Sequence, residues 1–192
     1  MNFHLNRQWM FAKLLVAGFL SLFAEQLRAQ SYAEDRAQIE DLMARYIITM
    51  DWRQPEAYAN TFTEDGAIVT TRVVTKGRVA LAQLIVDLAA AEDAQDKKED
   101  TMEWRPRRRH FVSNITIQVF GDTATSVSYW QAIDNRPDRK HGRVHSFGHY
   151  QDKLVKVDGQ WLFKERFMSN ETFVDRKASY DSPLDFMDSV DD

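Results

Sequence analysis

Acid–base chemistry without a cofactor requires a side chain that titrates near neutral pH, and His110 is the leading candidate for that role in this sequence. It follows the arginine-rich run "RPRRR" and opens the stretch "HFVSNITIQVF", whose composition predicts a β-strand. Isolated histidines are also ordinary surface residues, so the pattern places His110 either on a solvent-exposed face or in a polar-lined pocket. Strand alternation predicts one face with His110, Val112, Asn114, Thr116 and Gln118 and another with Phe111, Ser113, Ile115, Ile117 and Val119.

Asp51 is the candidate partner of His110. An amphipathic helix is predicted over 32–51, and Asp51 stands at its end, where the helix dipole does not favour a carboxylate. One interpretation is a cap for a second helix that begins near Gln54. The other is a carboxylate that orients and charges His110 through a hydrogen bond, which would give an acid–base dyad.

Two further side chains could contact a substrate. Tyr46 lies on the apolar stripe of the first helix and is by default a core aromatic, but a hydroxyl pointing at a cavity would be a proton donor to a leaving oxygen or a carbonyl. Arg166, in "WLFKERF", would bind a carboxylate or carbonyl if it faced inward, and is a surface residue otherwise.

Three histidines, His141, His145 and His149, are spaced by four, as metal ligands on a helix would be. Their segment, "GRVHSFGHYQDKL", is typical of a strand, where this spacing spreads the side chains over about 13 Å. We therefore predict no metal site, and we keep His145, His149 and Tyr150 as pocket candidates on one strand face or the other.

The order of elements predicts an α+β domain in which a curved antiparallel sheet wraps around three N-terminal helices. Helical spacing covers the first two segments and the one after the first strand, and the rest of the chain alternates as strands. The predicted elements are helices over 32–51, 54–62 and 79–95, a strand over 67–78, an exposed loop over 96–109, and strands over 110–122, 123–135, 142–159 and 160–173.

The two ends of the chain differ from the domain between them. Residues 1–30 combine basic residues, a short apolar run and a plausible cleavage region, which predicts a signal peptide and a periplasmic or secreted protein. The same features also fit an uncleaved N-terminal anchor. Residues 174–192 hold six aspartates and predict a loosely docked or mobile acidic tail.

Composition excludes several kinds of site. The chain has no cysteine, which excludes a disulfide, a thiolate nucleophile and any cysteine-ligated metal. Removing three basic residues and one acidic residue with residues 1–30 leaves 22 basic and 28 acidic residues, a formal charge of −6. That charge argues against nucleic-acid binding by Arg105, Arg107, Arg108 and Arg109, which we interpret as a solvated loop at the rim of a cavity. No glycine-rich phosphate loop or nucleophile elbow is present, so no cofactor is expected.

The order of elements and the patterns "RRHFVSN", "GDTATSVSYW" and "GHYQDKLVKVDGQWLFKERF" resemble the SnoaL-like branch of the nuclear-transport-factor-2-like superfamily. The resemblance covers residues 31–173 and implies a cone-shaped fold with a deep apolar pocket. Scytalone dehydratase and bile-acid 7α-dehydratase within this branch resemble this chain at the site. Tyr46 and Asp51 have the five-residue spacing of the tyrosine and aspartate in the bile-acid enzyme, and His110 stands where both enzymes have a histidine. One departure is Met50, where scytalone dehydratase has a tyrosine directly before its aspartate.

The resemblance implies a cofactor-independent lyase, of dehydratase type, acting on a mid-sized, ring-containing hydroxylated small molecule. An isomerase, a carbon–carbon lyase that releases a formyl carbon, or a non-catalytic binding protein would fit the same residues. It further implies that Arg78 lies near the pocket mouth, although Arg78 is equally explained as the start of the third helix, and that Trp52, Tyr58, Tyr129 and Trp130 are candidate walls. A homodimer or homotrimer is compatible with the resemblance, whereas a nucleic-acid partner or stable membrane insertion after cleavage is not expected.

Overall fold

The computed structural model describes residues 31–99, 108–135, 141–172 and 182–188, and the chain divides into two compact units, Met1–Ala37 and Gln38–Asp192. In the first unit the described residues, 31–37, are helical. The predicted signal peptide, the arginines Arg105 and Arg107, and most of the acidic tail lie outside the described residues. Of the helices that the described ranges contain, none combines the length and apolar composition needed to span a membrane.

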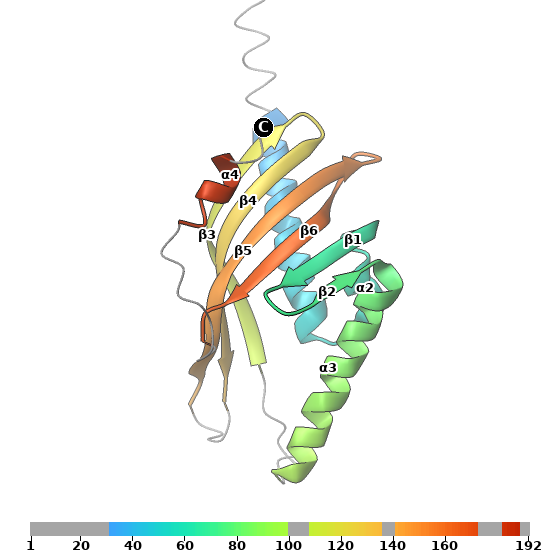
Figure 1. Ribbon diagram of the computed structural model, residues 1–192, viewed down its shortest axis with the longest axis vertical. Helices are drawn as coiled ribbons and strands as arrows, with labels where there is room; N and C mark the ends of the chain where they lie inside the picture. Colours follow the sequence, from blue (N-terminus) through green and yellow to red (C-terminus); the bar gives the residue numbers. More distant parts are fainter. Residues whose placement is uncertain (1–30, 100–107, 136–140, 173–181, 189–192) are drawn as a thin grey trace, which may run out of the picture. The chain divides into compact units, whose positions relative to one another are not determined.

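The second unit is built on one six-stranded sheet with the order β2-β1-β6-β5-β4-β3 (Figure 1). All neighbouring strands are antiparallel except β1 and β6, which run parallel. The α+β class with N-terminal helices is therefore confirmed, with a mixed rather than wholly antiparallel sheet. The strands are β1 (Phe62–Thr70), β2 (Val74–Lys76), β3 (Arg108–Phe120), β4 (Thr123–Asp134), β5 (Arg143–Val157) and β6 (Gln160–Asn170).

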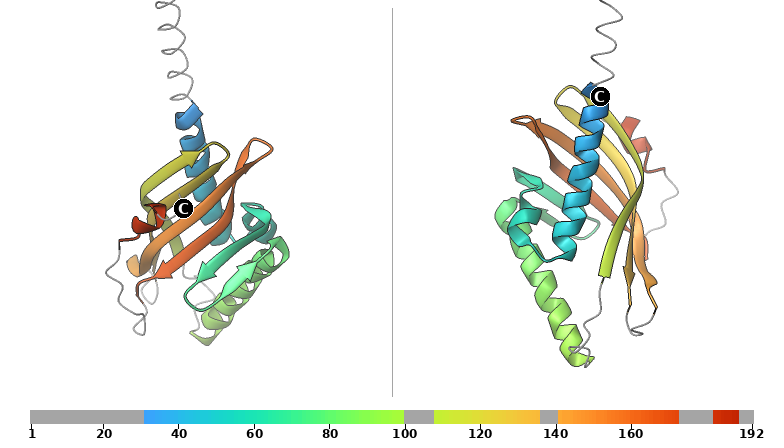
Figure 2. Two further views of the ribbon diagram at one scale, coloured as in Figure 1. Left: turned by 45° about the horizontal axis from the view of Figure 1, so that its top comes forward. Right: turned by 180° about the vertical axis from the view of Figure 1, so that it is seen from behind.

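Helical residues 38–51 lie against the inner face of this curved sheet (Figure 2). The apolar stripe predicted from the sequence is the buried face of this segment. It is followed by α2 (Pro55–Ala59) and, after the β1–β2 hairpin, by the long α3 (Arg78–Lys98). The stripe residues Ile39, Leu42, Met43, Tyr46 and Ile47 are each at most 6% exposed.

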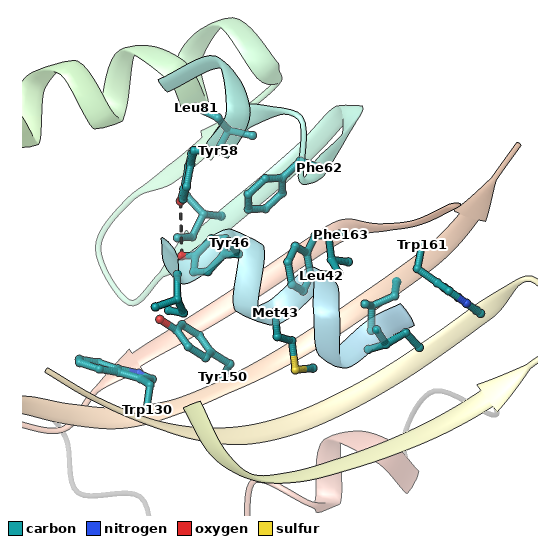
Figure 3. Packing of buried hydrophobic residues seen from close by; sticks show 14 of the residues in the cluster. Leu42, Met43, Tyr46, Tyr58, Phe62, Leu81, Trp130, Tyr150, Trp161 and Phe163 are labelled. Carbon is teal, nitrogen blue, oxygen red and sulfur yellow. Dashed lines mark hydrogen bonds between the residues drawn. The ribbon is translucent and has the colours of Figure 1, made fainter. Parts of the chain in front are cut away.

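Tyr46 occupies the centre of an aromatic core (Figure 3). Its ring centroid lies 5.0 Å from that of Tyr58, 5.9 Å from Phe62 and 5.6 Å from Phe163. Such tilted and edge-on contacts add to the free energy gained from burying the rings. The interpretation of Tyr46 as a core aromatic is therefore the one that the structure supports.

Three predicted boundaries were wrong. The predicted strand over 67–78 is a hairpin of β1 and β2, and β1 begins at Phe62, which had been assigned to the second helix. Gly66, expected in a turn, lies inside β1 at an irregular pairing with β6, where a Cβ would come within 2.8 Å of the Phe163 carbonyl. Helix α3 continues to Lys98, so the first part of the predicted exposed loop is helical.

The predicted alternation of β3 holds only for its first half. The pairing with β4 shifts between Ser113 and Thr116, and Asn114 has a φ of 53°, which marks a β-bulge with one extra residue. Beyond the bulge Ile117 is buried in the core, on the same side of the sheet as His110. The extra residue thus aligns a polar half-strand and an apolar half-strand on one inner face.

The acidic tail contains an element that its composition did not predict. A short helix, α4 (Asp185–Asp188), contacts β4, and Met187 within it is only 2% exposed. This part of the tail is therefore docked through an apolar side chain.

A charged pair lies wholly inside the core. Arg166 donates from Nε and Nη2 to the two carboxylate oxygens of Asp152 at 2.7 and 2.8 Å, and both side chains are 0% exposed. Ser126 donates a further hydrogen bond to Asp152 at 2.9 Å. Burial opposes the charge of Arg166, but the pair with Asp152 outweighs it and holds the pKa of the guanidinium above its ordinary value. The guanidinium also stacks on the rings of Tyr46 and Tyr150, at 4.3 and 4.1 Å from the centroids.

We predict that Asp152→Asn destabilises the protein by about 3–5 kcal/mol, because it leaves a buried guanidinium without its counter-charge. The matched control is Lys153→Gln in the next position, whose ion pair with Glu165 is about half exposed on both sides and should contribute under about 1 kcal/mol. Urea denaturation measures both. An equal loss of unfolding free energy in the two variants would show that the buried ion pair stabilises the protein no more than the exposed one.

Candidate active site

A cavity of about 610 Å³ opens where the N-terminal helix ends beside β3. Its walls come from the end of that helix, one side of α3, and the inner face of β3 to β6. This volume suits a ring-sized small molecule. Among the lining residues are Asp51, Trp52, His110, Trp130, Tyr150 and Met168.

Asp51 and His110 are in direct contact at this cavity. The Nδ1 atom of His110 lies 2.6 Å from Oδ1 of Asp51, and the backbone N–H of His110 donates to Oδ2 at 2.9 Å. The Asp51 side chain is 5% exposed and the His110 side chain 16%. One carboxylate therefore fixes both the strand and the ring of the same residue, and the dyad geometry expected from the sequence is present.

The position of Asp51 excludes its interpretation as a helix cap. The residue before α2 is Gln54, and no side chain caps that helix. Both carboxylate oxygens of Asp51 are instead directed to His110. Because an ionised carboxylate only accepts hydrogen bonds, the neutral form of His110 in this contact has its proton on Nδ1 and a lone pair on Nε2. No hydrogen bond to Nε2 occurs within the described residues, so this atom is the available base.

Tyr46 does not line the cavity, so its expected role as a direct proton donor is wrong for this structure. It accepts a hydrogen bond from the hydroxyl of Tyr58 at 3.3 Å, and its ring lies 6.0 Å from that of Tyr150 (Figure 3). Tyr150, which the sequence placed only as a pocket candidate, lines the cavity. Burial, together with the neighbouring Tyr46, raises the pKa of Tyr150 well above its ordinary value, so its hydroxyl stays a neutral donor.

The two histidines on β5, His145 and His149, lie in different surroundings. His149 bonds to Glu171 at 2.8 Å and does not line the cavity, which corrects its assignment to substrate binding. His145 does line the cavity. In the pairing of β4 with β5, His145 is an extra residue between Val144 and Ser146 and forms a bulge. Regular alternation would put His145 and Tyr150 on opposite faces of β5, but the bulge lets His145 reach the same side as Tyr150. No three histidine, aspartate or glutamate side chains in the described ranges are grouped as metal ligands.

The two arginines assigned to substrate binding have structural partners instead. Arg166 is the fully buried partner of Asp152 and does not line the cavity. Arg78 donates from Nε and Nη2 to the carbonyl of Phe62 at 3.0 and 2.8 Å, and it borders a different hollow. It therefore fastens the start of α3 to β1. Both predictions of substrate contact were wrong, because a strand or helix position does not reveal which partner an arginine finds.

Trp130 forms part of the cavity wall as predicted. Its ring centroid is 6.4 Å from that of His110 and 6.0 Å from that of Tyr150. The indole N–H on β4 crosses β5 and donates to the carbonyl of Ser169 on β6 at 3.1 Å. Gly148 makes the crossing possible, since a Cβ there would collide with the Ser169 carbonyl and come within 3.1 Å of the indole nitrogen.

The other predicted walls divide between cavity, core and surface. Trp52 lines the cavity, whereas Tyr58 is buried in the core and Tyr129 is 51% exposed on the opposite sheet face. The rim of the cavity carries charges that the sequence analysis largely missed. Arg53 and Glu92 line the cavity and were not expected there, whereas Arg108 and Arg109, two of the four arginines expected at the rim, do line it. A contact across the 39 residues from Arg53 to Glu92 has no local sequence pattern that could have revealed it.

Comparison with known proteins agrees with this architecture. The model of the SnoaL-like domain matches residues 31–167, and the chain belongs to this family. No curated protein matches the chain.

Solved structures give the fold. Rv3472 from Mycobacterium tuberculosis, described as a protein of unknown function and solved as a single-residue variant, is 28% identical with a TM-score of 0.64, covering 81% of this chain and 85% of its own. A nuclear-transport-factor-2-like protein with a cystatin-like fold from Novosphingobium aromaticivorans is 26% identical with a TM-score of 0.61, covering 81% and 90%. A protein from the same organism, provisionally called a scytalone dehydratase, is 25% identical with a TM-score of 0.58, covering 81% and 97%.

We predict that neutral His110 is found as the tautomer protonated at Nδ1, because the Asp51 carboxylate can only accept. Long-range ¹H–¹⁵N correlation spectra of ¹⁵N-histidine-labelled protein report the two ring nitrogens separately. In Asp51→Asn the amide can donate to Nδ1, and the tautomer should shift toward a proton on Nε2. A wild-type ring with a bare Nδ1 would contradict the assigned hydrogen bond.

Proposed function

We propose that this protein is a cofactor-independent lyase that removes water from a mid-sized, ring-containing hydroxylated small molecule. The observation that carries the proposal is the Asp51–His110 contact of 2.6 Å at the wall of an aromatic-lined cavity. A carboxylate that holds an imidazole with its second nitrogen bare is the arrangement of a general base. Membership of the SnoaL-like family and the similarity to a provisional scytalone dehydratase support the reaction class.

The proposed reaction needs one base and one neutral donor. Nε2 of His110 removes a proton from the carbon next to a carbonyl, and the electron pair moves into the carbonyl as an enolate. Asp51 stabilises the imidazolium that forms. The imidazolium then returns its proton to the hydroxyl on the neighbouring carbon, which leaves as water while the carbon–carbon double bond forms.

Tyr150 is the candidate for stabilising the enolate oxygen. It lines the cavity, and its raised pKa keeps the hydroxyl protonated at neutral pH, so it can donate a hydrogen bond to a developing negative charge. Tyr46 lies behind it in the core and acts, in this proposal, by holding the Tyr150 ring in place. The role first expected of Tyr46 thus passes to Tyr150.

Isomerisation, loss of a formyl carbon, or ligand binding without chemistry would use the same cavity. The first two share the proton removal by His110 and differ only in the fate of the anion. The identity of the product separates them from dehydration. We also propose, from the pattern of residues 1–30 alone, that the protein acts after export.

The proposal predicts that His110→Gln lowers turnover by about 10²–10⁴-fold with little change in ligand affinity. The measurement is mass-spectrometric detection of water loss from a panel of hydroxylated cyclic ketones, with Kd values determined in parallel. Asp51→Asn should lose at least about 10²-fold, because it disturbs the ring tautomer.

The matched control is His149→Gln, which disrupts an equivalent histidine–carboxylate contact of 2.8 Å at a site that does not line the cavity. It should retain wild-type turnover. Compounds that bind but react in neither the wild type nor any variant would favour a binding protein. Water loss that persists in His110→Gln would remove the proposed base.

A further inference from the structure

Arg109 is a cation at the cavity wall whose charge no described residue neutralises. Its guanidinium carbon lies 4.8 Å from the ring centroid of Trp52, and Nη1 donates to the carbonyl of Arg108 at 2.6 Å. The structure gives it no ion pair with any described residue, and its Nε and Nη2 atoms make no hydrogen bond there. Arg109 is partly buried, and both it and Trp52 line the cavity.

The other arginines at this cavity are already paired. Arg53 contacts Glu92 at 2.9 Å and Asp93 at 2.8 Å. Arg108 lies 3.6 Å from both Glu92 and Asp134. These carboxylates therefore compensate two of the three rim cations and leave Arg109 available for a ligand.

We propose that the molecule bound in this cavity carries a carboxylate, which Arg109 binds through Nε and Nη2. These two donors form the planar fork that matches the two oxygens of a carboxylate. The guanidinium stacks on the Trp52 ring, and this contact restricts its orientations before a ligand binds, so less conformational entropy is lost on binding. The inference rests on the proposed function and narrows its substrate class to ring-containing hydroxylated acids.

The position of Arg109 also fixes where the carboxylate would lie. Arg109 and His110 are neighbours on β3, and Trp130 and Tyr150 form the wall beyond His110. An acid held at the rim would therefore direct its ring past the imidazole toward these aromatic side chains. The chain as a whole has a net charge of −4 and repels anions, so a preference for an acid requires a local cation such as Arg109.

The test compares two probes of the same size, 2-naphthoate and 2-naphthamide, by titration calorimetry with the intact chain. The wild type should bind the carboxylate about tenfold more tightly than the neutral amide, which is the usual weight of a charge-assisted hydrogen-bond pair at a partly exposed site. Arg109→Gln should abolish the preference, because it weakens binding of the carboxylate more than binding of the amide. Arg109→Lys, which keeps the charge and loses the fork, should retain part of it.

The matched control is Lys156→Gln. It also removes a cation stacked on a tryptophan, since Lys156 lies 5.1 Å from the Trp161 ring centroid, but that pair does not line the cavity. The control should keep the wild-type preference. Equal affinity for the two probes, no binding of 2-naphthoate to the wild type, or a preference that survives in Arg109→Gln would overturn the inference.

Failure of this inference can be told from failure of the proposed function, because the binding test involves no turnover. His110-dependent water loss from neutral compounds, without a preference for 2-naphthoate, would remove the acid site and leave the lyase. An Arg109-dependent preference, without water loss from any hydroxylated acid, would leave an acid-binding cavity and remove the lyase.

Discussion

The fold depends on a full charge that is buried in the middle of its core. The guanidinium of Arg166 is completely enclosed, and among the described residues only the carboxylate of Asp152, on the neighbouring strand, compensates its charge. Three aromatic rings, those of Tyr46, Tyr150 and Phe163, lie within 4.3 Å of its central carbon. A buried ion is tolerated only where such partners are fixed in place. The helix that carries Tyr46 must therefore pack against β5 and β6 in a single arrangement.

The same packing holds the side chains of the cavity wall in place. Tyr150 contacts the buried guanidinium on one side and forms cavity wall on the other, so its ring is held by the core rather than by a ligand. The carboxylate of Asp51 connects the end of the helix to the first residues of β3 through two hydrogen bonds. A site whose side chains are fixed before a ligand arrives loses little conformational entropy on binding.

Much of this arrangement could be predicted from the sequence, because strong patterns carry it. The helical stripe around Tyr46, the strand pattern after His110, and the resemblance to SnoaL-like proteins were enough for the fold and for the Asp51–His110 contact. The interior could not be predicted in the same way. Whether Tyr46 or Tyr150 meets the cavity, and whether Arg166 meets a substrate or Asp152, depends on bulges and on partners distant in the chain.

The bulge at Asn114 shows how one residue controls both halves of β3. Before the bulge in the sequence, His110 lies on the inner side of the strand, and after the bulge Ile117 does. Each residue added to or removed from a strand turns every side chain on one side of that point to the opposite face. A chain that lacks one residue at this bulge could bury Ile117 in the core or present the His110 imidazole to the cavity, but it could not do both. The length of this strand, as much as the identity of its residues, therefore encodes the site.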